Sequence, residues 1–301
     1  MNSWIFLAIL GHLANAVAFI IDKVLLTTTL KRSATYAVLI STLSLVVIVA
    51  APWVQHWPNH SLYLPIMGYG GLFVLGLWAF FEALKRSEAS RVVPIVGSFV
   101  PIFTLLEAVL FLQEKFTAQQ LFGFFVLLIA TWLLTRKNKS SVQRSKHSMT
   151  LLILAALLFA TASVLGKYAF AHGEFLGVFV SSRVVAGIVG IVLGLLISGV
   201  KQELFSLIRG GKSNQRTPIW AIIGQLFGAL GFILISIAIA QGSAPMVNVL
   251  QAVQYGAIVL VAWFGSKRLR ELLNEEKNRH IILTKTLAII LIALGLMLIT
   301  L

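Results

Sequence analysis

Long apolar blocks dominate this chain, and they limit its possible folds more than any other feature. Each block is close to the ~20 residues that a helix needs to cross the hydrocarbon core of a bilayer. Charged residues make up 11% of the chain, against about 25% in an ordinary soluble domain. A soluble protein of this composition would expose too much apolar surface to water. The sequence therefore predicts an all-α integral membrane protein.

We count ten spans along the chain. They cover Trp4–Leu26, Ala34–Ala51, Leu62–Leu84, Arg91–Leu112, Ala118–Thr135, Thr150–Phe170, Leu176–Ser198, Pro218–Ala240, Pro245–Gly265 and Ile281–Thr300. The start, MNSWIFLAIL, has no basic segment and is interpreted as part of the first span rather than as a signal peptide. The longest connections are the basic segment Arg136–His147, the predicted loop Gly199–Thr217, and Ser266–His280, whose charges have the spacing of a short surface helix.

The basic residues predict an orientation in the membrane. Ten spans place alternate connections on opposite faces. Of the 24 lysines and arginines, only Lys115 and Lys167 fall on one face, while Lys23 and Arg183 lie inside spans and the rest fall on the other face. Basic connections are enriched on the cytoplasmic side. We therefore expect a multi-pass protein of the plasma (inner) membrane with a cytoplasmic linker and both termini outside. The net charge of +14 is explained by this asymmetry rather than by nucleic-acid binding.

A weak internal repeat divides the chain into two units. The first span ends with DKVLL (Asp22–Leu26) and the sixth with GKYAF (Gly166–Phe170). Small residues seven positions apart recur in the fifth span (Gly123, Ala130) and the tenth (Ala288, Gly295). Because five is an odd number of spans, the second unit would enter the membrane upside down. The expected domains are residues 1–135, the linker 136–148, and residues 149–301, as two inverted five-helix repeats, a transporter architecture.

One part of the sequence resembles a known family. FVPIFTLLEAVLFLQEKFTAQQLFGFFVLLIATWLL (Phe99–Leu134) is similar to the fourth and fifth helices of an EamA domain. The matching features are Pro101 followed by an aliphatic residue and Phe103, then Glu114–Lys115, Thr117, Gly123 and Ala130. The chain departs from the family at Gln113, where a glycine is usual, and in the longer segment Ser266–His280. The resemblance implies the ten-helix form of the drug/metabolite transporter superfamily, with helix four of each half lining a central cavity.

The fourth span carries polar residues that support this implication. Pro94, Gly97, Ser98, Pro101 and Thr104 follow helical spacing along one side. Prolines free backbone carbonyls, which lipid cannot satisfy but a cavity can. We interpret Ser98 and Thr104 as candidate substrate ligands; simple kinking and close packing are the alternative.

The first span carries His12, Asn15 and Asp22 within about an 80° arc. Asn15 is predicted to face the cavity. His12 is either a titrating coupling group or a hydrogen-bonded packing residue. Asp22 is either a coupling residue or one half of an ion pair with Lys23 or Lys85.

The ninth span carries the richest set of neutral hydrogen-bonding side chains, all within about a 120° arc. These residues are Asn248, Gln251, Gln254 and Tyr255. Their amides would lack partners in lipid, so they must face protein or a cavity. We interpret them as substrate-binding residues, and interhelical hydrogen bonding is the alternative.

Two charges lie at similar depth inside spans. By helix rise, Glu107 is about 7–8 Å and Arg183 about 10 Å from the outer surface. One interpretation is a gate, in which the two charges pair when the outer side is closed and separate when it opens. The other is a free guanidinium that binds a carboxylate or a phosphate. Asp22, Glu107 and Arg183 are the predicted coupling or gating residues.

Two glycine series run at helical spacing in the seventh and eighth spans. They comprise Gly187, Gly190 and Gly194, and Gly224, Gly228 and Gly231. Such series allow close helix contacts, and we assign them no ligand.

The sequence offers no catalytic or metal-binding motif, and it contains no cysteine. We therefore predict a secondary transporter, an exporter of a small metabolite, that works by alternating access. It needs no cofactor and is not an enzyme. Its partners are the substrate and the bilayer, as a monomer or homodimer. The alternative is an integral membrane enzyme or flippase that acts on a lipid-linked substrate.

Overall fold

The computed structural model describes residues 3–28, 33–86, 89–135, 146–208, 217–266 and 279–300, and the secondary-structure elements in these residues are all helices. The first part contains α1 (Ser3–Thr28), α2 (Ser33–Leu43), the 3₁₀ helices η1 (Ser44–Trp53) and η2 (His60–Leu62), α3 (Tyr63–Arg86), α4 (Ala89–Phe111) and α5 (Ala118–Thr135). The second contains α6 (Lys146–His172), α7 (Phe175–Leu196), α8 (Val200–Ile208), α9 (Thr217–Gln241), α10 (Ala244–Val249), α11 (Gln251–Phe264) and α13 (Arg279–Thr300).

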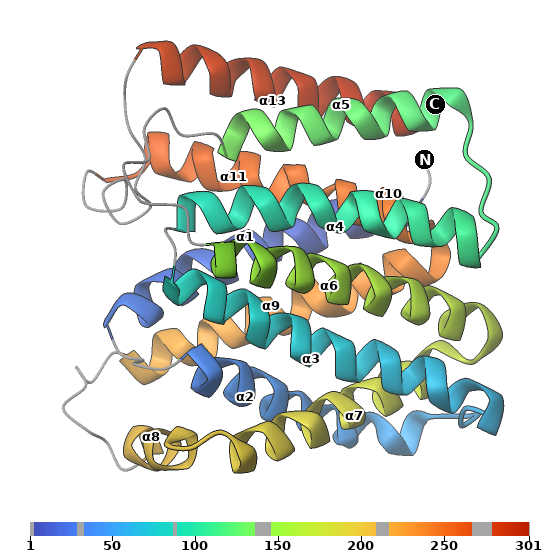
Figure 1. Cartoon of the computed structure of the whole chain (residues 1–301). Coiled ribbons are helices and arrows are strands. Elements are labelled where there is room, and N and C mark those ends of the chain that lie inside the picture. Colours follow the sequence, from blue (N-terminus) through green and yellow to red (C-terminus); the bar gives the residue numbers. More distant parts are fainter. Residues whose placement is uncertain are drawn as a thin grey trace.

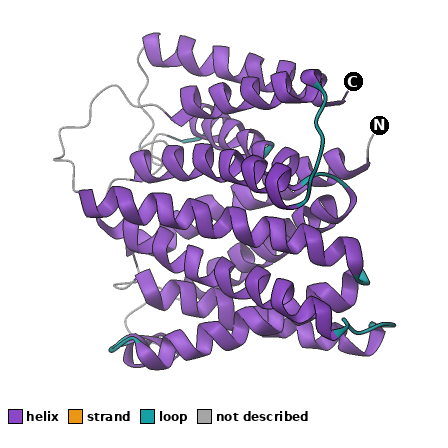
Figure 2. Cartoon of the chain, turned by 45° about the vertical axis from the view of Figure 1, so that its right-hand side comes forward, coloured by secondary structure: helices purple, strands orange, loops and turns teal. Residues whose placement is uncertain are grey.

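The long helices run side by side in one bundle (Figures 1 and 2). The N- and C-terminal ends of the chain lie at the same end of this bundle, which we call the terminal end (Figure 1). Large apolar side chains cover the outside, including Leu64 (79% exposed) and Phe264 (87%). In water such a surface would be unfavourable, whereas lipid chains solvate it.

Helical structure is found at each of the ten predicted positions. Among the described residues, eight candidate spans are long and apolar enough to cross a membrane. The apolar parts of α4 (Ile95–Phe111) and α5 (Ala118–Leu134) are shorter. The protein is thus an all-helical membrane protein with eight candidate spans and two shorter apolar helices.

The structure corrects several details of the sequence prediction. The predicted loop Gly199–Thr217 contains α8, in which Glu203 accepts a hydrogen bond from Thr35 Oγ1 (2.7 Å). The predicted linker 136–148 overlaps the start of α6 at residues 146–148. The possible surface helix in Ser266–His280 lies mostly outside the described residues.

Two predicted spans are not uniform α-helices. The second changes to a 3₁₀ helix at Ser44, whose single hydroxyl proton is shared between the carbonyls of Ser41 (2.6 Å) and Arg183 (2.9 Å). The ninth is interrupted at Leu250, between α10 and α11.

The halves interlock through glycine-mediated contacts. α1 packs along α9 and α3 along α6, while α5 lies against α13 and α2 against α7. On α7, the predicted glycine series packs against α2 and η1, with Gly190 facing Ser41. On α9, Gly231 packs against Gly11 and Asn15 of α1. Since side chains here would overlap the neighbouring helix, small residues permit these close contacts.

Candidate substrate site

Buried polar side chains of α1 meet the break between α10 and α11. His12 is 4% exposed, and its Nε2 donates to the Val247 carbonyl (2.9 Å). Because a carbonyl can only accept, Nε2 carries the proton and Nδ1 is left as an acceptor. Nδ1 is buried and has no hydrogen-bond partner within the described residues. Gln254, itself buried, interacts with the same imidazole ring.

The polar side of α4 faces α10 and α11. Asn248 Nδ2 donates to Thr104 Oγ1 (3.0 Å), and Thr104 in turn donates to the Val100 carbonyl (2.7 Å). The ring of Tyr255 lies against Gly97, where a Cβ atom would come within 2.8 Å of Tyr255 Cε2. The structure therefore brings two sets of predicted site residues, from α4 and from α10 and α11, into contact.

The other predicted ligands have different surroundings. Ser98 Oγ is buried and has no partner among the described residues. Asn15 faces Gly231 of α9, whereas His12 contacts α10. Gln251 is partly exposed, immediately after the interruption at Leu250.

Asp22 lies in a separate polar group. It hydrogen-bonds to the Tyr36 hydroxyl, to which Gln225 Nε2 also donates (3.5 Å). Its Oδ1 atom is buried with no partner in the described part of the chain. The alternative ion pairs of Asp22 involve Lys23 and Lys85, whose side chains lie outside the described residues.

Glu107 faces α6 rather than the α10–α11 contact. Its Oε1 accepts a hydrogen bond from Thr161 Oγ1 (2.9 Å), and the side chain is partly exposed. Val100 and Phe103 of α4 pack on the same helix, α6. The contact of Glu107 with Thr161 was not predicted from the sequence.

Arg183 lies in an aromatic cage formed by Tyr69, Phe73 and Phe232. Its Cζ atom is 4.1 Å from the ring centroid of Phe232, 5.0 Å from Tyr69 and 5.2 Å from Phe73. The side chain is 5% exposed. Its Nε and Nη2 atoms are buried without a hydrogen-bond partner among the described residues. Arg183 and Glu107 therefore do not form an ion pair in this structure.

The cage is held by its own hydrogen bonds. Ser236 Oγ donates to the Phe232 carbonyl (2.8 Å). Since this bond uses the serine proton, the Tyr69 hydroxyl is the donor in its 3.0 Å contact with Ser236 Oγ. The Tyr69 ring is thereby tied to α9, the helix that carries Phe232.

Contacts between the halves close the terminal end of the bundle. Ser243 Oγ, at the turn before α10, donates to Glu114 Oε2 (2.8 Å), after α4. Ser3 Oγ of α1 donates to Gln241 Oε1 of α9 (3.1 Å). Lys167 Nζ donates to the Ala240 carbonyl (3.2 Å) and is attracted by Glu114.

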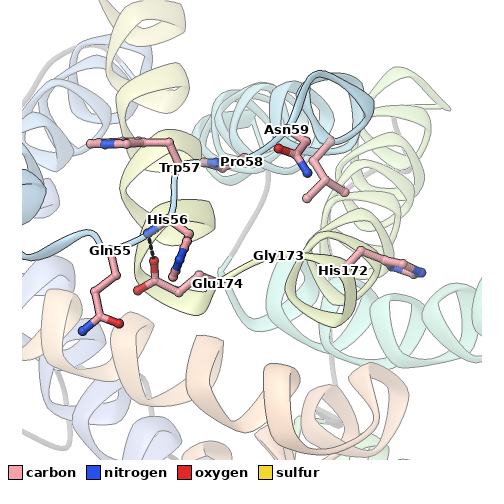
Figure 3. A pocket seen from close by; sticks show the side chains of 9 residues that line it. Gln55, His56, Trp57, Pro58, Asn59, His172, Gly173 and Glu174 are labelled. Carbon is pink, nitrogen blue, oxygen red and sulfur yellow. Dashed lines mark hydrogen bonds between the residues drawn. The ribbon is translucent and has the colours of Figure 1, made fainter.

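A surface pocket of about 400 Å³ lies where the segment after η1 meets the end of α6. Its lining comes from the segment between η1 and α3 and from the α6–α7 turn (Figure 3). The His56 backbone amide donates to Glu174 Oε2 (2.7 Å), which ties the two segments together.

Several site residues were missed by the sequence interpretation. Tyr36 and Gln225 are polar residues inside apolar spans, so the rule that selected Asn15 could have found them. Tyr69, Phe73 and Phe232 carry no such signal, because aromatic residues are equally common on lipid-facing surfaces.

Comparison with known proteins gives a family match and a similar fold. Residues 2–136 match the EamA-like transporter family. No curated protein matches the chain. A solved structure described only as "Crystal structure of protein" has 16% sequence identity and a TM-score of 0.69, covering 100% of this chain and 99% of that chain. At this identity the likeness shows the fold alone. The family match favours a membrane transporter over an enzyme. The match of residues 2–136, which contain α1 to α5, to the EamA-like transporter family thus confirms the resemblance seen in the sequence.

Proposed function

We propose that this protein is a secondary transporter that exports a small metabolite by alternating access. The observation that supports the proposal is that buried polar side chains of the first half form hydrogen bonds to the second half. His12 bonds to Val247, and Thr104 bonds to Asn248. Lipid-facing positions would leave such groups unsatisfied, whereas a shared interface can exchange these bonds for bonds to a substrate.

The packing supports ten spans arranged as two inverted repeats. If α1 corresponds to α6 and α3 to α9, exchanging the halves converts the α1–α9 contact into the α6–α3 contact. Both contacts are extensive. The α2–α7 and α5–α13 contacts each map onto themselves under the same exchange. Inverted repeats of this kind enclose a site near the middle of the membrane.

The proposed orientation places the terminal end outside and the linker 136–148 in the cytoplasm of a cell whose plasma (inner) membrane holds the protein. In this orientation the Glu114–Ser243 and Ser3–Gln241 contacts close the outer side. The interface residues around His12, Ser98, Thr104 and the polar stripe from Asn248 to Tyr255 would bind the substrate.

Asp22 and Glu107 are the carboxylates available for coupling to protons in this proposal. Within the described part of the chain, Asp22 accepts a hydrogen bond from Tyr36 and Glu107 accepts one from Thr161. Binding or releasing a proton would change whether those bonds are charge-assisted, and so could bias one conformation over the other.

The test begins with a thermal-shift screen of purified protein against metabolite pools. Compounds that stabilise the protein are then assayed for counterflow in proteoliposomes. We expect at least one stabilising compound to accumulate against empty-vesicle controls, and Asn248→Leu to reduce that uptake at least tenfold. Thr300→Val, which removes an exposed hydroxyl group at the end of α13, should leave uptake unchanged. Stabilisation without any counterflow would reject the transporter proposal.

A further inference from the structure

We propose that Arg183 is a binding site for the carboxylate of a substrate with an apolar or aromatic body. This inference deepens the proposed function and rests on it for the word substrate, but the binding itself can be tested separately. The starting observation is that the Arg183 guanidinium is buried and that its Nε and Nη2 atoms have no partner among the described residues. Isolated charges inside a membrane are costly, and those that persist usually serve a function.

The two unpartnered nitrogens are the pair that a carboxylate uses. Nε–H and one N–H of Nη2 lie on the same edge of the planar guanidinium group and point in nearly parallel directions. A carboxylate accepts both at once, in a bidentate pair. Both donors are buried and lack a protein acceptor in the described residues. One edge of the guanidinium group, formed by Nε–H and Nη2–H, therefore has no acceptor among the described residues, and we call it the recognition edge.

The aromatic cage holds this edge in place. Tyr69, Phe73 and Phe232 lie within 5.2 Å of Arg183 Cζ. Cation–π contacts satisfy the guanidinium without using its N–H groups. The cage thus restricts the rotation of the side chain while its donors remain unused, which lowers the entropy lost when an anion binds.

The residues of the aromatic cage determine which class of ligand Arg183 can bind. The cage offers one positive charge, and its only hydroxyl groups, Tyr69 and Ser236, bond to each other. A phosphate monoester would bring a second charge with no partner here, at a large desolvation cost. A monocarboxylate is neutralised by Arg183 alone, and its apolar part can lie against the rings.

A series of rings connects the cage with the terminal end. Phe170, Phe175 and Phe179 follow one another with centroids 5.0 and 5.6 Å apart, and Phe179 lies 6.1 Å from Phe232. Phe175 follows Glu174 of the surface pocket directly. Arg183 is eight residues further along α7, or about 12 Å by helix rise. Packed aromatic rings therefore run from the α6–α7 turn, which lines the pocket, to the cage.

The experiment measures binding in detergent, without transport. Acetate, benzoate and phenylacetate are each compared with the neutral amide of the same shape, by calorimetry and thermal shift. We expect benzoate or phenylacetate to bind at least tenfold more tightly than its amide. Arg183→Gln should abolish this preference. Arg183→Lys should weaken it at least tenfold, because an ammonium group keeps the charge and loses the planar edge.

Lys167→Gln is the matched control, since Lys167 is a cation near the C-terminal end of α6 that already donates to the Ala240 carbonyl. It should keep the preference for carboxylate. If Arg183→Gln does not yield folded protein, the Arg183→Lys comparison decides alone. Equal binding of acid and amide by the native protein, or an unchanged preference in Arg183→Lys, would overturn the inference. Arg183-dependent binding without carboxylate flux in proteoliposomes would support the carboxylate site and reject the transporter proposal. Flux of neutral compounds that is independent of Arg183 would support the transporter proposal and reject the carboxylate site.

Discussion

The two charges at similar predicted depth, Arg183 and Glu107, are treated differently by the fold. Glu107 is partly exposed and accepts a hydrogen bond from Thr161. Arg183 is nearly fully buried among three rings, and two of its nitrogens have no described partner. The Thr161 hydroxyl group thus hydrogen-bonds to Glu107, whereas the Nε and Nη2 groups of Arg183 have no acceptor among the described residues. A buried charge without a protein partner is better explained by a ligand than by stability.

The largest expected effect comes from removing a wall of the Arg183 cage. Phe232 contacts the guanidinium at 4.1 Å and packs against Tyr69, Phe73 and Phe179. We expect Phe232→Ala to lower the stability of the ligand-free protein by about 3 kcal/mol, since a large ring leaves a cavity. Phe227→Ala, on the lipid-facing side of the same helix (37% exposed), is the control. Equal losses for both variants, measured by thermal unfolding in detergent, would show that the cage contributes no special packing.

On the Glu107 side, Thr161→Val tests whether that charge depends on its single described donor. The substitution preserves shape and removes the hydroxyl group that donates to Oε1. We expect a loss of about 1–2 kcal/mol, as for a partly buried hydrogen bond to a charged group. Ser163→Ala, two residues along on α6, removes only a bond to the Phe159 carbonyl (3.0 Å) and should cost less. A neutral Thr161→Val result would mean that water already solvates Glu107.

A smaller effect is expected from Tyr69→Phe, which keeps the ring over Arg183 and removes the bond to Ser236. Ser236 keeps its bond to the Phe232 carbonyl, so the loss should be about 1 kcal/mol. Benzoate binding should change less than threefold, since the hydroxyl group is not part of the proposed recognition edge. A loss of binding as large as that of Arg183→Gln would instead make Tyr69 a direct ligand of the anion.

The positions of the helices could be predicted from the sequence because long apolar blocks and short polar connections are local features. The contact of α4 with α10 and α11 could also be anticipated, since Thr104 and Asn248 lie on polar stripes that needed partners. The break at Leu250 could not be predicted. The Val247 carbonyl beside this break accepts a hydrogen bond from His12, which lies 235 positions away in the sequence. α8 was missed because a nine-residue helix is too short to give a strong periodic pattern.

The cage could not be predicted for a different reason. Phe73 and Phe232 look the same in the sequence as residues that face lipid, and only the fold brings them to Arg183. The sequence therefore left two interpretations of Arg183 open, a gate with Glu107 or a ligand site. The structure separates the two charges, which favours the second.

A double-mutant cycle tests this central claim most directly. Arg183→Gln, Glu107→Gln and the double variant are compared with the native protein for folded yield and for the free energy of unfolding, without ligand. If the two charges act separately, the effects should add to within about 0.5 kcal/mol. If either single variant is much less stable than the double variant, the survivor has lost its partner. That result would show that Arg183 and Glu107 form a pair, and it would contradict the assignment of Arg183 to a ligand.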